Sequence, residues 1–197
     1  MRKRLIMIFV CSTVSLTFVQ STLLERDLAR QHTTHNAIDT LDTDTLFTKY
    51  QRRAVAYLSR PLFNGTPLTG EMLAHCAKLT WQKHGVIIPV ELALAQAQLE
   101  TRLGTGGRAG HRTNPYNLGE WDGRTSSGFK TTEQGVMAYY ELLASRYFTG
   151  GRTEEDLFIL FIDKAGYYYA TVEYGPVIKE SFIYIRGWID HELKKKV

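Results

Sequence analysis

The carboxylate best placed for chemistry in this sequence is Glu100, which lies near the end of a predicted helix. Residues 89–103 are rich in Ala, Leu, Gln and Glu, which favour helix, and Pro89 suits a first helical position. One turn before Glu100, its face holds Gln96 and Ala97, and two turns before it Ala93; these side chains let a neighbouring element approach and exclude water. Lost hydration and the negative end of the helix dipole both disfavour a charged carboxylate, which favours a proton donor. The alternative from these residues alone is a solvated surface glutamate.

Four segments resemble the motifs of bacterial peptidoglycan N-acetylglucosaminidases, which are lysozyme-like enzymes. In chain order they are AQAQLETRLGT at 95–105, NPYNLG at 114–119, FKTTEQG at 129–135, and YAT at 169–171 followed by Tyr174. Their order is that of the family, and it is more specific than any one motif. The chain departs from the family at Thr101, where serine is usual, and at Val172-Glu173, where Asp-Pro is usual. The segment between Gly119 and Phe129 is also much shorter than in many members.

The resemblance implies an α+β, mainly helical, lysozyme-like fold with a small β-hairpin lobe. It also implies hydrolysis of the β-1,4 glycosidic bond after N-acetylglucosamine in peptidoglycan glycan strands. Glycoside cleavage needs an acid that protonates the leaving oxygen and a second group that stabilises or traps the oxocarbenium-like centre. We expect Glu100 to be the acid and Glu120 the second group, with Asp122 as the alternative to Glu120. For Glu120 and Asp122, the competing interpretation is a solvated hairpin charge.

Two other functions compete with hydrolysis. A lytic transglycosylase uses a similar fold and one glutamate, and it leaves an anhydro-muramyl end. A non-catalytic glycan-binding domain is the second alternative, favoured if the shortened segment after Gly119 has lost its carboxylate role.

Aromatic and asparagine side chains are the candidates for holding the sugar rings. Aromatic rings can stack on the apolar faces of sugars, and asparagine amides can contact acetamido groups. Each aromatic also has an ordinary interpretation as a core residue, and each asparagine as a turn residue. The candidate substrate-binding residues are Asn114, Tyr116, Asn117, Trp121, Tyr140, Tyr169 and Tyr174, with Tyr139 as a further aromatic candidate.

Helices must position these residues, and capping residues predict where they begin. We expect helices over 46–58, from Thr69 to about Lys83, over 89–103, from the Thr131/Gln134 capping box to Gly150, from Thr153 to about Lys164, and over 174–194. Residues 104–129 should hold the β-hairpin, turning at Asp122-Gly123. The expected buried stripes are Met72, Cys76 and Leu79; Val136, Tyr140, Leu143 and Tyr147; and Ile178, Phe182, Ile185 and Ile189.

Composition describes a globular chain, and charge argues against nucleic acid as a partner. The 197 residues are 44% hydrophobic and 22% charged, with a net charge of +4. Basic residues at the two ends (Arg2, Lys3 and Arg4, then 194–196) account for that excess, so the body shows no general basic surplus. Cys76 is the only cysteine of the body, which excludes an internal disulfide and favours a small core residue. We expect a monomer, no cofactor and no metal, since the histidines show no ligand spacing.

The N-terminus has the form of an export signal. Its basic start precedes an apolar run over 5–19, which is shorter than the ~20 residues that span a bilayer. We therefore divide the chain into a signal peptide or signal anchor at 1–20, a polar tether at 21–44 and a lysozyme-like domain at 45–197. The expected location is periplasmic or extracellular, with an uncleaved membrane anchor as the alternative to cleavage.

Overall fold

The computed structural model describes residues 44–106, 111–119, 128–148 and 174–195. The chain forms two compact units, Met1–Leu46 and Phe47–Val197, and the architecture below belongs to the second. The expected signal segment, tether and helix at 153–164 lie outside the described residues.

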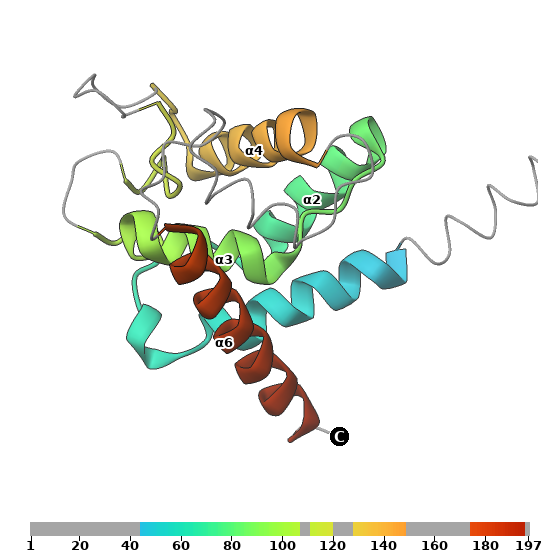
Figure 1. Ribbon diagram of the computed structural model, residues 1–197, viewed down its shortest axis with the longest axis vertical. Coiled ribbons are helices and arrows are strands. Elements are labelled where there is room, and N and C mark those ends of the chain that lie inside the picture. Colours follow the sequence, from blue (N-terminus) through green and yellow to red (C-terminus); the bar gives the residue numbers. More distant parts are fainter. Residues whose placement is uncertain (1–43, 107–110, 120–127, 149–173, 196–197) are drawn as a thin grey trace, which may run out of the picture. The chain divides into compact units, whose positions relative to one another are not determined.

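The described part is mainly helical, as the sequence predicts (Figure 1). A helix over 44–58 leads into the short 3-10 turn η1 (Pro61–Phe63). The helices α2 (Gly70–His84) and α3 (Val90–Thr101) follow. Next, α4 (Thr132–Leu142) continues directly into the π-helical turn η2 (Leu143–Tyr147), and α6 (Tyr174–Lys194) is the last helix described. These residues contain no strand, and the hairpin turn expected at Asp122-Gly123 lies outside them.

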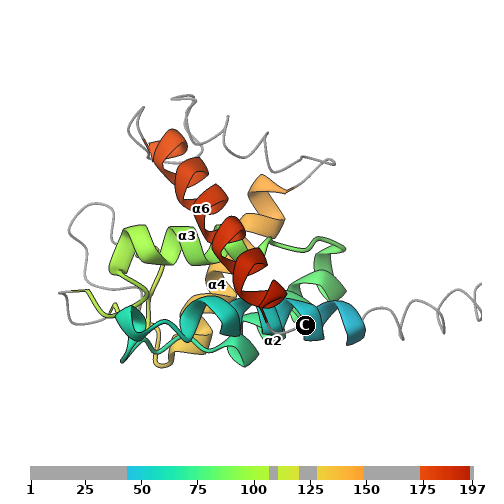
Figure 2. The ribbon, with the colours of Figure 1, turned by 90° about the horizontal axis from the view of Figure 1, so that it is seen from below.

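The second unit is built around α3. Its residues Val90–Ala97 are all buried, which is typical of a helix covered on every side. On one side α6 packs across it, as Figures 1 and 2 show from two directions. The helix over 44–58 contacts it through Tyr57, whose hydroxyl donates to Gln98 Oε1 at 2.5 Å. On α4, the Tyr139 hydroxyl donates to the buried Gln96 Oε1.

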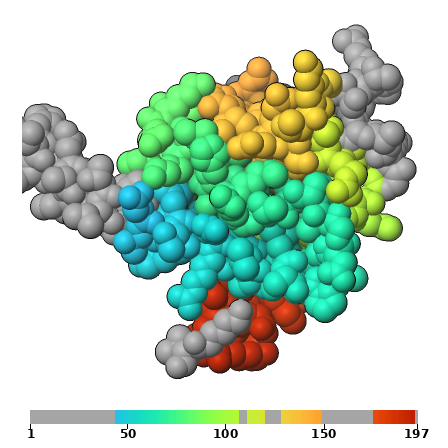
Figure 3. Space-filling view, turned by 180° about the vertical axis from the view of Figure 1, so that it is seen from behind, coloured from blue at the N-terminus to red at the C-terminus, as the bar shows by residue number. Residues whose placement is uncertain are grey.

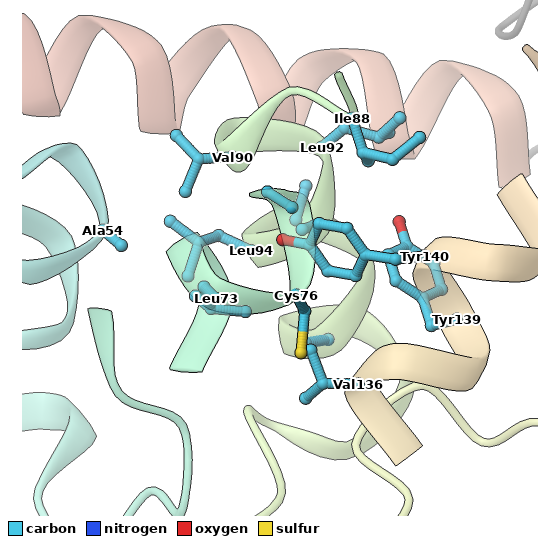
Figure 4. Close-up of a cluster of buried hydrophobic side chains, with 14 of the residues drawn as sticks. Ala54, Leu73, Cys76, Ile88, Val90, Leu92, Leu94, Val136, Tyr139 and Tyr140 are labelled. Atoms are coloured by element: carbon cyan, nitrogen blue, oxygen red, sulfur yellow. The ribbon is translucent and has the colours of Figure 1, made fainter. Parts of the chain in front are cut away.

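The core confirms two of the three predicted stripes. The four residues expected on the inner face of α4 and η2 are buried, and so are the four expected on α6. On α2 the prediction was partly wrong: Cys76 is buried, but Met72 is half-buried and Leu79 is 40% exposed. The buried side of α2 uses smaller residues, Ala74, Ala77 and Thr80, together with Leu73. Figure 4 shows Cys76 and Leu73 within this core, near Val136 and Tyr140.

Local signals set three helix ends where the sequence predicts them. Thr69 accepts a hydrogen bond from Met72 N at 3.1 Å, and Gly85 ends α2 with φ 68°. Thr131 accepts from Gln134 N at 3.2 Å, while Gln134 Oε1 accepts from Lys130 N at 2.9 Å, so the capping interaction reaches one residue further than expected. Pro89 is the N-cap of α3, not its first helical residue.

Candidate functional site

The buried helix α3 reaches solvent only in its last turn, where Glu100 lies. Gln98 and Glu100 are half-buried and Leu99 is 40% exposed, whereas Thr101 is 2% exposed. The side chains one turn earlier on the Glu100 face, Ala97 and Gln96, are fully buried. Glu100 therefore stands at the border between the buried part of α3 and solvent.

Thr101 holds the end of α3 against the 111–119 segment. Its hydroxyl donates to Pro115 O at 2.7 Å and approaches Ala97 O at 3.2 Å, and it accepts a hydrogen bond from Gly104 N at 2.8 Å. The chain then turns sharply, with positive φ at Arg102 (52°), Leu103 (59°) and Gly104 (78°). The Thr101 hydroxyl, at a position where serine is usual in the family, thus fixes the end of α3 beside Glu100.

Asn114 shapes the NPYNLG segment from inside. Its side chain is fully buried, with Oδ1 accepting from Leu118 N and Nδ2 donating to Leu118 O, both at 3.0 Å. This ring of two hydrogen bonds closes the turn that contains Asn117, whose φ is 52°. The structure therefore gives Asn114 a turn-forming role.

The third motif packs directly against the second. A Cβ on Gly135 of α4 would lie 2.1 Å from Thr113 O, so only glycine permits this approach. Thr132 at the start of α4 donates through Oγ1 to Arg112 O at 2.9 Å. Three segments that are separate in the sequence thus meet at one end of α3.

Stacked tyrosines lie beneath this junction. The rings of Tyr116 and Tyr139 are parallel within 4°, with centroids 3.6 Å apart, and Tyr140 meets Tyr139 edge-on. The Tyr140 and Tyr50 hydroxyls are hydrogen-bonded at 2.6 Å. Burial raises the pKa of Tyr116 and Tyr140 well above the usual tyrosine value, so both stay neutral.

Burial separates the substrate-binding candidates. Tyr140, Asn114 and Tyr116 are at most 2% exposed, so in this structure they have no surface that a sugar could contact. Asn117 is half-buried, and its Oδ1 has no hydrogen-bond partner within the described residues. That atom is an acceptor for a donor from a ligand or from the rest of the chain.

The remaining candidates are not placed. Glu120, Asp122, Trp121 and Tyr169 lie outside the described residues, and Tyr174 is described only through its backbone as the first residue of α6. Their roles stay predictions.

Sequence reasoning missed the residues that assemble the site. In the sequence Thr101 is a departure from the family's serine, and the hydroxyl that both residues share is the signal for its hydrogen bonds. Gly135 belongs to the third motif, but one sequence gives no sign that it will pack against the backbone of Thr113. Outside this site, one sequence also gives no sign of the ion pair between half-buried Arg53 and buried Glu91, with 2.6 Å between Nη2 and Oε1.

No described helix has the length and apolarity to cross a membrane, and the described residues contain no group of three potential metal ligands. Comparison with known protein families, with curated proteins and with solved structures finds no match for this chain.

Proposed function

We propose that this chain is a peptidoglycan hydrolase that cleaves the β-1,4 bond after N-acetylglucosamine, with Glu100 as the general acid. The observation that carries the proposal is the meeting of three motif segments at the solvent-reaching end of α3. Thr101 bonds to Pro115 O, and Gly135 packs on Thr113 O. Three of the four segments that carry the resemblance thus pack on one another beside the helix turn that holds Glu100.

The position of Glu100 suits proton donation. The buried face beneath it removes water on one side, and the negative end of α3 opposes its ionised form. Glu100 itself is only half-buried, which suits a group that must meet the glycosidic oxygen. The hydrogen bonds of Thr101 restrict the backbone directly after it, so the carboxyl group is held on a rigid element.

In this proposal Glu120 is the second group, which stabilises or traps the oxocarbenium-like centre, and Asp122 is the alternative. In the sequence, Glu120 directly follows Gly119, which is the last described residue of the segment that Thr101 and Asn114 fix. The GlcNAc acetamido group is a further nucleophile that could trap the anomeric centre, and a carboxylate would then assist it. The lysozyme-like fold with a β-hairpin lobe, the substrate contacts of Asn117, Trp121, Tyr169 and Tyr174, and export by residues 1–20 belong to the same proposal.

The chemistry of the new chain ends tests this function. Purified peptidoglycan is digested with the full chain, the new ends are reduced with borohydride, and the products are analysed by mass. Hydrolysis after N-acetylglucosamine predicts a reduced glucosamine end. Anhydro-muramyl ends would assign a lytic transglycosylase instead, and binding without any new end would leave a non-catalytic glycan-binding domain.

A further inference from the structure

A basic pocket lies between the helix over 44–58 and the C-terminal end of α6. It has a volume of about 440 Å³, and Arg53, which donates to Asp190 Oδ1 at 2.8 Å, crosses it from one helix to the other. Figure 3 shows the first helix (blue) and α6 (red) next to each other at the surface. The residues that line the pocket are Lys49, Arg52, Arg53, Asp190, Leu193 and Lys194.

The positive charge of this pocket is only partly balanced. Arg53 is held by two carboxylates, Glu91 at 2.6 Å and Asp190 at 2.8 Å. Lys49, Arg52 and Lys194 have no ion-pair partner within the described residues. Lys49 and Arg52 are three residues apart on one helix, a spacing at which like charges face each other and repel.

Of the three cations, only the position of Lys194 is explained by a contribution to helix stability. Lys194 lies in the last turn of α6, where a positive charge favours the helix dipole. Lys49 and Arg52 lie in the middle of their helix, so the dipole gives no reason for them. An anion in the pocket would neutralise all three.

We propose that this pocket binds an organic phosphate. Lysine and arginine are the usual partners of phosphate, and the excess of cations over Asp190 matches an anionic ligand. Leu193 and the alkyl stems of the basic side chains add apolar contacts for the organic part of the ester. The volume falls within the range of about 300–1,000 Å³ that is typical of small-molecule sites, so a bare phosphate would not fill it.

The pocket is separate from the proposed catalytic site. Arg53 binds Glu91 in the first turn of α3, whereas Glu100 lies in the last turn, roughly 14 Å away along the axis at ~1.5 Å per residue. The phosphate has two possible sources, the headgroup of an anionic phospholipid or a soluble phosphate ester. In the sequence, the apolar run at 5–19 and the polar stretch after it lead directly into the helix that carries Lys49 and Arg52.

Lysine footprinting of the full chain tests the proposal. Lysines are acylated with a membrane-impermeant reagent, and the extent at each residue is measured by mass spectrometry. Four conditions are compared with the free protein: glycerol phosphate, sodium chloride at matched ionic strength, vesicles of phosphatidylglycerol with phosphatidylcholine, and vesicles of phosphatidylcholine alone. Lys130, which is exposed and lies outside the pocket, is the internal control.

We expect Lys49 and Lys194 to lose reactivity several-fold while Lys130 does not change. Protection by glycerol phosphate identifies a soluble ester as a ligand, and protection by phosphatidylglycerol vesicles alone identifies the lipid headgroup. Arg52→Gln should restore the reactivity of both lysines, whereas Arg112→Gln, which removes an exposed arginine elsewhere, should not. The proposal is overturned if neither source protects Lys49 and Lys194, if sodium chloride protects them equally, or if Lys130 is protected to the same extent.

Discussion

At the end of α3, the buried hydroxyl of Thr101 links three backbone segments: its own helix, the turn at Gly104 and the segment at Pro115. When one partner of a buried hydrogen bond is removed, the other polar atom keeps the free-energy cost of its desolvation and has no hydrogen bond to offset it. The Thr101 hydroxyl therefore fixes the turn at 102–104, which directly follows the helix end that carries Glu100.

Thr101→Val should lower the free energy of unfolding by about 1–3 kcal/mol, because Gly104 N and Pro115 O lose their hydrogen-bond partner in a buried site. Thr101→Ser keeps the hydroxyl and loses only a methyl group, a cost of about 0.8 kcal/mol. Chemical denaturation of both variants measures the difference. Equal losses in the two variants would show that the hydroxyl does not matter.

Cys76 is predicted to be chemically inert in the folded protein. Burial raises the pKa of its thiol to about 12, so almost no thiolate exists at pH 8. Iodoacetamide at pH 8 should leave Cys76 unmodified in the native state and modify it fully in denaturant, as read by peptide mapping. Because the folded pKa is the higher one, this group contributes stability below pH ~8.5, the usual cysteine value, that is lost as the pH rises toward 12. Rapid native alkylation would contradict the packing of α2 against α4.

At the scale of elements, the contact between α4 and the NPYNLG segment depends on the absence of a side chain at Gly135. Gly135→Ala would place Cβ 2.1 Å from Thr113 O, a backbone atom that cannot move by a rotamer change. We expect a loss of about 1–3 kcal/mol of stability from this overpacking. The measurement is the midpoint and slope of denaturant unfolding.

Gly187→Ala on α6 is the matched control, because a Cβ there meets nothing within 4 Å. It should stabilise α6 by about 0.5–1 kcal/mol through helix propensity. If both alanine variants gained stability, α4 would not pack on Thr113 as described.

The elements themselves were largely predictable, because their signals are local. Threonine caps at 69 and 131 and the apolar stripe of α6 depend on residues within a few positions of each other. The error on α2 has a physical cause: large apolar residues were expected inside, but close packing selected Ala74, Ala77 and Thr80 and left Leu79 at the surface.

At the scale of the whole molecule, what the sequence could not supply is long-range contact. The motif order located Glu100, but nothing in one sequence pairs Thr101 with Pro115 or Arg53 with Glu91 and Asp190. The burial of Tyr140 likewise depends on Tyr50, which lies 90 positions away. Contacts between residues far apart in the sequence decide whether an aromatic side chain faces a ligand or the core. The substrate-binding candidates were therefore the least predictable part of the site.

The most direct test of the proposed function is the peptidoglycan-digesting activity of Glu100→Gln, measured as the rate of release of soluble fragments. Loss of general-acid catalysis typically costs ~10²–10⁴ in rate, and we expect at least that loss with unchanged folding by circular dichroism and denaturation. Glu180→Gln, which changes an exposed carboxylate on α6, should keep the wild-type rate. A folded Glu100→Gln protein that digests peptidoglycan at the rate of Glu180→Gln would contradict the assignment of Glu100 as the acid.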